Sequence, residues 1–518
     1  MINFQNANTK VKRDVEKLNS SLSKEILEDF LNFKLSLRKK NISNHIIEKR
    51  TKLEDKNNDN KINNRKKLYE YKKKFEIEKI TETFGKIISN DPNINYLKDK
   101  NIIELIHLYS QHLNSNDNVK NVLGTNIDKI INIFLNEILK DINSQSINFE
   151  LFDYYLIILG NLFIYKASTY DNDNNDYLSL LLNIINKNTN LEMYKDYNFD
   201  IINDTLWLIY LYIYFDDKHN MNTFPFIIKT VNDLFNNDFY EDLRNFSTKG
   251  KNDKISSTIV KEIIYSGIHI YLSIFENLIV VNKNRQIIIQ KEDLQNCFDI
   301  LIIILNFNLF KDIFIEDSTN IISLILAISR NIFTLDFSQF YPIYIDLFEK
   351  YKNYEYDNKN ISKNLIFILF YLIENYCEDK SFFQILNDSS IIPICIQYYL
   401  KNGSIINIVL KTLNMFFKYP FNYHKLIIKS INYQLLDKTC EIISNIDNNE
   451  NIIYECLNIL INAYAFLENN MKNPSNENIL RYYDLKIISK IEQLILHDNK
   501  NICEMASFLY KKFKNIES

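Results

Sequence analysis

The scarcity of glycine and proline is the feature that most restricts how this chain can fold. The 518 residues contain only six of each. β-Sandwiches, barrels and dinucleotide-binding folds need many tight turns and left-handed backbone positions, for which Gly is the usual solution. Helical proteins manage with fewer, because Asn, which is abundant here, tolerates the left-handed position that ends many helices. The composition therefore predicts an all-α protein.

A polar, charged first part precedes a long helical part. Residues 1–80 have few long apolar faces, and 52–67 are predicted to be a flexible linker. After about residue 81, apolar residues recur at helical spacing between Asn- and Asp-rich turns, as Ile487, Ile491 and Leu494 do. The units recur at roughly 40–50 residues, which is typical of armadillo or HEAT solenoids, where successive hairpins bury one another's faces. We expect a solenoid over 81–518 with about nine or ten repeats, the last at about 484–518.

The two parts carry opposite charge. Residues 1–80 hold 21 Lys and Arg against 12 Asp and Glu, which leaves 40 basic and 53 acidic residues for the remainder. A basic segment on an acidic body favours docking within the chain or binding to an acidic partner. Because nucleic-acid binding normally needs a basic face, the acidic body is not expected to bind nucleic acid directly.

Three stretches resemble the importin-α family. The basic segment LSLRKKNISNHIIEKR at residues 35–50 is similar to the importin-β-binding segment of that family. The stretch ISKIEQLILHDNKNICEMASFLYKKF at residues 488–513 resembles its final armadillo repeat, and residues 385–417 resemble a helix, turn and following helix of an inner repeat. The resemblance implies an all-α, right-handed superhelical armadillo solenoid behind a flexible basic segment.

The resemblance also implies a cargo site. Importin-α proteins bind extended, Lys- and Arg-rich nuclear-localisation peptides on a concave ladder of Trp and Asn, spaced W-x-x-x-N along one helix of successive repeats. Asn side chains clamp the peptide backbone, while indole faces hold lysine side chains by cation–π contact. The matching cargo-peptide-binding candidates are Asn161, Trp207, Asn277, Asn331, Tyr371 and Asn375.

The ladder is incomplete, because no repeat keeps both Trp and Asn. Ile157 stands four residues before Asn161 at the Trp position, and Leu211 replaces the Asn that would follow Trp207. Family members also place an Asp four residues after one of these Asn residues, and counting from Asn161 gives Tyr165. The first half of the groove is therefore predicted to be weaker than the second. Each Asn has an alternative as a turn or surface residue, and Trp207 has one as a core residue.

The basic segment implies the partners. Five cations would meet acidic residues of importin-β: Arg38, Lys39, Lys40, Lys49 and Arg50. Such an interface associates quickly and is sensitive to salt. Released from importin-β, the same segment could fold back and compete with cargo. The family resemblance further implies an export receptor for recycling, and localisation to both cytoplasm and nucleus.

Nothing in the sequence favours an enzyme. The seven His residues are scattered, and no Walker A, GxGxxG, HExxH or GxSxG motif occurs. We expect no cofactor and no metal. The most apolar run, at residues 297–310, is interrupted by polar residues and too short to span a bilayer, so no membrane insertion is expected.

Two other functions remain open. An armadillo scaffold that has lost cargo recognition would merely assemble protein partners. A HEAT-type transport receptor is the third possibility, but such receptors are typically longer and lack the detachable basic helix.

Overall fold

The computed structural model describes discrete stretches of the chain, and every regular element in them is a helix. The described residues are Ile103, Ile106, 127–143, parts of 151–163, 177–189, 196–215, 223–235, 254–281, 289–306, 311–329, 334–352, 359–376, 379–401, 405–418, 420–445, 449–470 and 487–517. The prediction of an all-α protein is confirmed for these residues. The basic segment over 1–80 lies outside them.

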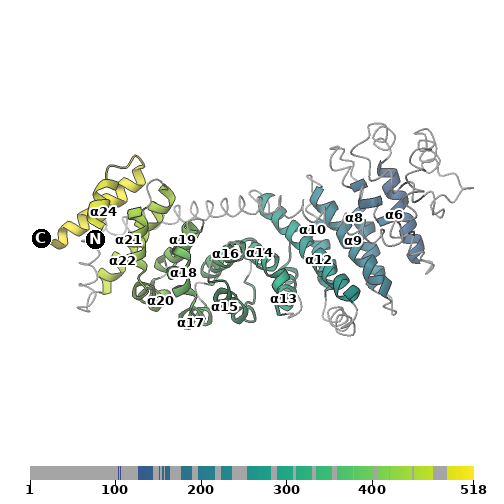
Figure 1. Ribbon diagram of the computed structural model, residues 1–518, viewed down its shortest axis with the longest axis horizontal. Helices are drawn as coiled ribbons and strands as arrows, with labels where there is room; N and C mark the ends of the chain where they lie inside the picture. The colour runs from purple at the N-terminus through teal and green to yellow at the C-terminus, as the bar shows by residue number, and fades with distance from the viewer. Residues whose placement is uncertain are drawn as a thin grey trace, which may run out of the picture. The chain divides into compact units, whose positions relative to one another are not determined.

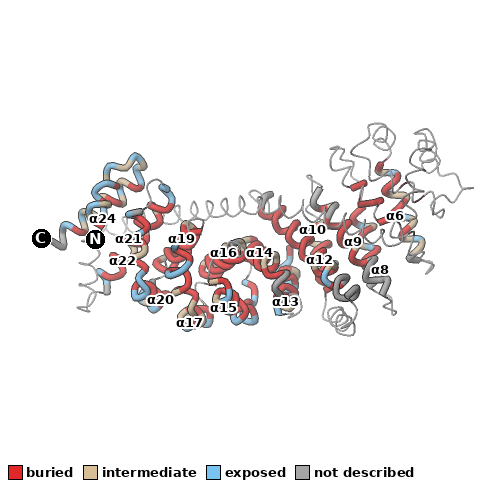
Figure 2. The backbone as a smooth tube through the Cα atoms, viewed as in Figure 1, coloured by how far each residue is buried: buried red, intermediate tan, exposed pale blue. Residues whose placement is uncertain are grey.

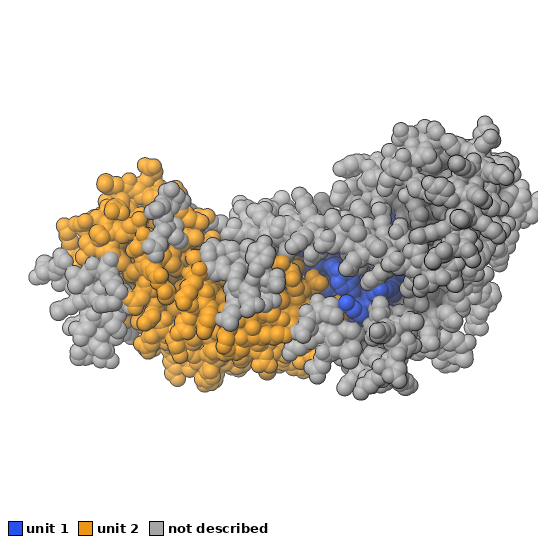
Figure 3. Space-filling model, in the orientation of Figure 1, with its two compact units in different colours: residues 1–293 blue, residues 294–518 orange. Residues whose placement is uncertain are grey.

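The chain divides into two compact units, residues 1–293 and residues 294–518 (Figure 3). Each unit has its own apolar interior, made mostly of Ile, Leu, Phe and Tyr side chains.

In the first unit, the long helices α9 (Asp196–Phe215) and α12 (Lys254–Val281) pack along each other (Figure 1). The shorter helices α6 (Ile127–Asn143), α8 (Tyr177–Thr189) and α10 (Phe224–Leu234) pack beside them: α6 on α8, α8 on α9, and α10 on both α8 and α12. Residues 158–160 are also helical.

The helices of the second unit form two series, one of longer and one of shorter average length. Its longer helices are α14 (Lys311–Ser329), α16 (Lys359–Asn375), α19 (Ile406–Lys418), α22 (Glu450–Asn470) and α24 (Lys500–Glu517). The series of shorter average length consists of α13 (Lys291–Asn306), α15 (Phe340–Lys350), α17 (Lys380–Asp388), α18 (Ile391–Gln397), η4 (Tyr399–Lys401), α20 (Pro420–Asn432) and α21 (Leu435–Asn445). Its member α13 begins just before the unit boundary and is longer than α19.

The longer helices of the second unit pack in chain order. Helix α14 contacts α16, α16 contacts α19, α19 contacts α22, and α22 contacts α24. The shorter helices form a second series in which α15 contacts α18, α18 contacts α20, and α20 contacts α21. Residues 364–373 of α16 are all buried, whereas α24 is buried along one face only, at Ile502, Ala506, Leu509 and Phe513 (Figure 2). A helix with packed neighbours on several sides needs apolar residues all round it.

Asparagine and aspartate start helices in the described residues. Asp379 accepts hydrogen bonds at the start of α17, and the Asn449 and Asn499 side chains accept backbone N–H groups at the starts of α22 and α24. This is the N-cap role that short polar side chains perform well. Among the described non-glycine residues, Gln434 has a left-handed backbone conformation, with φ of 67°. Within the described residues, asparagine therefore serves helix starts at Asn449 and Asn499, and Gln434 takes the left-handed position.

None of the helices in the described stretches is long and apolar enough to cross a membrane.

Candidate functional site

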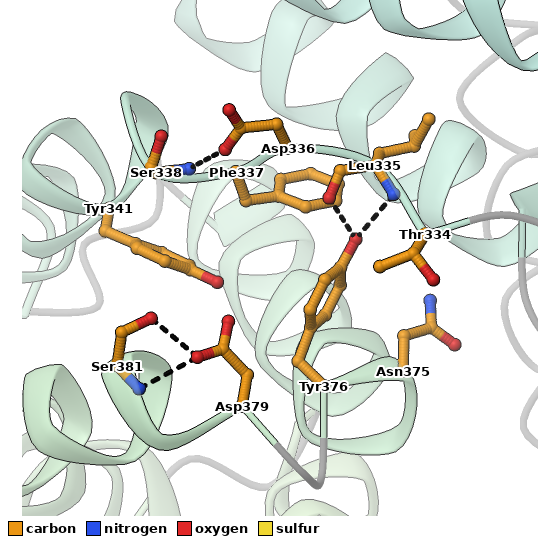
Figure 4. Close-up of a pocket in the computed structure, with 10 residues that line it drawn as sticks. All are labelled: Thr334, Leu335, Asp336, Phe337, Ser338, Tyr341, Asn375, Tyr376, Asp379 and Ser381. Carbon is orange, nitrogen blue, oxygen red and sulfur yellow. Dashed lines mark hydrogen bonds between the residues drawn. The ribbon is translucent and has the colours of Figure 1, made fainter.

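A pocket of about 450 Å³ opens in the second unit between two successive turns. One turn leads from α14 to α15 and the other from α16 to α17 (Figure 4). Ten residues line it: Thr334, Leu335, Asp336, Phe337, Ser338, Tyr341, Asn375, Tyr376, Asp379 and Ser381. Its volume lies within the range of roughly 300–1,000 Å³ that small ligands usually occupy.

Local hydrogen bonds fix the turn between α16 and α17. Oδ1 of Asp379 accepts the backbone N–H of Ser381 at 2.8 Å, the hydroxyl of Ser381 at 2.6 Å and the backbone N–H of Phe382 at 3.3 Å. Asp379 is thus the N-cap of α17. The other oxygen, Oδ2, accepts no hydrogen bond from the described residues. The N-cap therefore leaves half of the carboxylate available on the pocket side.

The turn between α14 and α15 is held from two directions. The Asp336 carboxylate accepts the backbone N–H of Ser338 at 2.9 Å. The backbone N–H of Asp336 donates to the side-chain oxygen of Gln295 on α13, and the backbone carbonyl of Asp336 accepts from the Gln295 side-chain nitrogen. From the other side, the Tyr376 hydroxyl donates to the carbonyl of Leu335 at 2.8 Å and accepts its N–H at 3.0 Å. Since Tyr376 directly follows α16, these two bonds tie the two turns together across the pocket.

Both carboxylates of the pocket stay ionised at neutral pH. Burial alone would raise the pKa of Asp379, but hydrogen bonds from Ser381 and Phe382 outweigh it and hold that pKa below its usual value. Hydrogen bonds from Ser338 likewise lower the pKa of Asp336. Burial raises the pKa of Tyr341, and the charges of Asp379 and Asp336 raise it further. The negative charge of both carboxylates therefore acts on the interior of the pocket.

The charge of the lining is uncompensated within the pocket wall. None of its ten residues is Lys or Arg. Asn375 is the last residue of α16 and donates its Nδ2 to the Leu326 carbonyl at 3.4 Å. Its buried Oδ1 accepts no hydrogen bond from the described part of the chain. The two ionised carboxylates are hydrogen-bond acceptors, so the arrangement suits a cationic group that brings hydrogen-bond donors.

Asn375 is the one predicted cargo-binding residue that lines this pocket. Tyr371, one turn earlier on α16, is only 2% exposed and packs with Phe370 at a ring separation of 5.4 Å. Its burial places it in the helix packing rather than on a surface.

The two ladder candidates that the structure describes in the first unit are also buried. Trp207 on α9 is 7% exposed and Asn277 on α12 is 8% exposed. The indole of Trp207 lies against the backbone of Gly160, where a methyl group added to the glycine would come within 2.4 Å of the ring. The roles of Trp207, Asn277 and Tyr371 in peptide binding stay predictions.

The remaining predicted site residues lie outside the described residues. These are Asn161 and Asn331 of the ladder and Arg38, Lys39, Lys40, Lys49 and Arg50 of the basic segment.

Sequence reasoning missed the two carboxylates of the pocket, although one carried a signal. Asp379 stands four residues after Asn375, which is the Asn-to-Asp spacing that the family resemblance attaches to a cargo site. Counted from Asn161 alone, that spacing gives Tyr165 and leaves Asp379 unnoticed. Asp336 has no comparable signal, since its place in the pocket follows from the packing of α14 beside α16.

The pocket is not arranged as a metal centre. Within the described stretches, no group of three or more His, Cys, Asp or Glu side chains is placed to hold a metal ion. The chain matches no known protein-family model, and no curated protein is significantly similar to it.

Proposed function

We propose that this chain is an importin-α-like nuclear import adaptor. An armadillo solenoid, wound as a right-handed superhelix, would bind basic nuclear-localisation peptides, and Arg38, Lys39 and Lys40 would help recruit importin-β. The adaptor would shuttle between cytoplasm and nucleus and would return with an export receptor. It would bind cargo as a protein-interaction module, without catalysis and without a cofactor.

The spacing of the long helices supports the armadillo part of the proposal. They begin at residues 311, 359, 406, 450 and 500, an interval of 44 to 50 residues. Each contacts the next in chain order, and a second series of shorter helices runs beside them. A solenoid of helical repeats has this nearest-neighbour pattern, because each unit buries its faces on the units before and after it.

The pocket beside Asn375 carries the cargo part of the proposal. Asn375 ends the long helix α16, Asp379 stands in the turn that follows it, and the turn before α15 adds Asp336. A lysine ammonium placed there would form charge-assisted hydrogen bonds, each contributing about 1.5–3 kcal/mol. The pocket lies in the second unit.

Burial of the aromatic ladder candidates favours the scaffold alternative. Trp207 and Tyr371 are deeply packed, and neither lines the pocket. A scaffold would keep the helical stack and bind partners elsewhere on it. The two functions differ in one measurable property, which is selective affinity for lysine-rich peptides through Asp379.

Peptide binding to the full chain tests this difference. The full chain should bind a labelled peptide with a central run of lysines, and should not bind a matched peptide with glutamines. Asp379→Asn keeps an N-cap oxygen for α17 but removes the charge, so we expect the affinity to fall about tenfold. Asp346→Asn is the matched control, because Asp346 is an exposed carboxylate on α15 away from the pocket.

Two outcomes of this experiment would favour the scaffold. One is equal binding of the lysine and glutamine peptides. The other is an equal loss of affinity in Asp379→Asn and Asp346→Asn, since the effect would then reflect overall charge and not the pocket. To prevent competition by the chain's own basic segment, each variant is also measured in an Arg38→Ala, Lys39→Ala, Lys40→Ala background.

The same triple substitution tests the importin-β part. Purified importin-β should capture the full chain, and the triple variant should lose capture because three of the five proposed contacts are gone. Capture of the wild-type chain should also weaken steeply as salt is raised. Unchanged capture by the triple variant would remove this segment from the mechanism.

A further inference from the structure

Three aromatic rings stand around the pocket, and the proposed function does not use them. Phe337, Tyr341 and Tyr376 all line it. Figure 4 shows Tyr341 and Tyr376 on opposite sides, with Phe337 and Asp379 between them at opposite ends. The rings of Phe337 and Tyr376 are 5.2 Å apart and inclined at 79°, so two walls of the pocket meet nearly at a right angle.

Each ring is fixed by its own contacts with the protein. Tyr376 is held through its hydroxyl by the two bonds to Leu335. Tyr341 stacks on Phe382 at 5.4 Å, and Phe337 packs edge-on against Phe298 at 4.3 Å. Side chains that are already ordered lose little conformational freedom when a ligand binds. The rings therefore form a preorganised enclosure.

The charge in this enclosure has the sign that a cation needs. Asp379 directs an oxygen with no hydrogen bond from the described residues toward the space between the two tyrosines (Figure 4). Aromatic faces and a nearby carboxylate attract cations without requiring N–H donors from them. A volume of about 450 Å³ is also generous for a bare ammonium group. These features fit an ammonium group that carries methyl substituents.

We propose that this pocket binds an N-methylated ammonium group, presented by a trimethyllysine side chain of a basic peptide. The proposal rests on the proposed function, because it refines which peptides the pocket selects. The same head group also occurs on small quaternary ammonium compounds such as choline. The three rings contact the methyl groups, and Asp379 supplies the opposite charge.

The inference is tested by measuring the affinity of a series of peptides for the full chain. Three peptides share one sequence and differ at a single residue: lysine, trimethyllysine, or an uncharged analogue with a tert-butyl group in place of trimethylammonium. We expect trimethylation to increase the affinity roughly threefold or more, and the uncharged analogue to bind about tenfold more weakly than the trimethylated peptide. Weaker binding after trimethylation, or equal binding of the uncharged analogue, overturns the inference.

A ring variant tests whether Tyr341 contributes the selectivity. Tyr341→Phe keeps the aromatic face and should keep the preference for the trimethylated peptide, whereas Tyr341→Leu should abolish it. A preference that persists in Tyr341→Leu overturns the role of this ring. Because Tyr341 is buried, circular dichroism must first show that both variants are folded.

A spectroscopic measurement avoids dependence on the variants. With wild-type protein and a peptide carrying ¹³C-labelled N-methyl groups, ring currents from the enclosure should move the methyl proton resonance upfield on binding. Binding without such a shift overturns the inference. This readout remains available even if Tyr341→Leu does not fold.

Two further measurements distinguish failure of this inference from failure of the proposed function. Tetramethylammonium and choline should displace the trimethylated peptide only at much higher concentration than a competing peptide does. Direct binding of tetramethylammonium or choline, measured by calorimetry, together with no measurable binding of the trimethylated peptide would assign the pocket to a free quaternary ammonium ligand and overturn the peptide source. Asp379-dependent binding of the lysine peptide that is weakened by trimethylation would overturn this inference and leave the proposed function intact. No binding of any of the peptides would overturn both.

Discussion

Trp207 and Asn375 are predicted from the same family ladder, but the two side chains lie in very different surroundings. Trp207, in the first unit, is 7% exposed and presses on the backbone of Gly160. Asn375, in the second unit, ends α16 and lines a pocket with Asp379 and Asp336. The comparison teaches that a side chain matching a binding motif can serve packing in one part of a chain and a pocket in another.

The difference has a simple physical basis. Gly160 has no side chain, so a neighbouring helix can bring a large ring against its backbone, and the indole then replaces the missing side-chain volume. Asn375 lies at a helix end, beside turns, where backbone groups diverge and leave space. A large apolar ring gains most from burial, whereas the Asn375 side chain is only partly buried and keeps a hydrogen bond, from Nδ2 to the Leu326 carbonyl.

The largest expected effect is that of removing the indole. Trp207→Ala should lower the free energy of unfolding by about 3–5 kcal/mol, because it leaves a cavity in the packing of the first unit. Chemical denaturation followed by circular dichroism measures this, since Trp207 is the chain's sole Trp and its fluorescence is lost. Trp207→Phe should cost less. A small loss of stability together with a large loss of peptide affinity would place Trp207 in the binding surface after all.

The next effect comes from the partner of the indole. Gly160→Ala would place a methyl group 2.4 Å from the Trp207 ring, and the resulting overpacking should cost roughly 1–3 kcal/mol. Combined with Trp207→Leu, the same alanine should cost much less, because the clashing ring is gone. Fully additive losses in the double variant would show that the two residues do not press on each other as described. Gly267→Ala, which meets the Phe235 ring at 2.3 Å, is a second case of the same kind.

In the pocket, the stability effects should be smaller than the binding effects. Asp379→Ala removes the N-cap of α17 and should lower the free energy of unfolding by about 1 kcal/mol, whereas Asp379→Asn should leave it nearly unchanged. Both should weaken peptide binding, because both remove the carboxylate charge. If Asp379→Asn destabilised the fold as much as Trp207→Ala, the contrast between a packing site and a binding site would disappear.

The smallest effect concerns pH. The pKa values of Asp336 and Asp379 are lowered in the folded protein, so both charges persist below the usual titration range of Asp, centred near pH 3.9. Their stabilising hydrogen bonds are fully present above that range and are lost as pH falls through the lowered values. We therefore expect lysine-peptide affinity to stay constant from pH 7 to about pH 5. Fluorescence anisotropy measures it, and a loss of binding between those values would point to a different titrating group.

Some features of the fold could be predicted from the sequence. The scarcity of Gly predicts helices, and the described residues contain only helical regular elements. The contribution of Gly at close helix contacts could not be predicted, because neither Gly160 nor Gly267 stands at a turn. Their use depends on which ring the neighbouring helix presents, which is a property of tertiary packing.

The candidate site was only partly predictable for a related reason. Asn375 follows from the spacing of the family motif, and Asp379 could have been found by the same spacing. Asp336, Phe337 and Tyr341 come from the preceding turn and helix, about 40 residues earlier, and nothing local in the sequence relates them to Asn375.

The sequence by itself determined the helices, the polar turns between them and the separation of a basic segment from an acidic body. Helical periodicity and capping act over a few residues, so they can be read from the chain. Only the tertiary structure decided that Trp207 is packed and that Asn375 borders a pocket. Whether a side chain meets another helix or open space depends on how α14 packs beside α16 and how α9 lies against its neighbours, and that packing is a property of distant residues acting together.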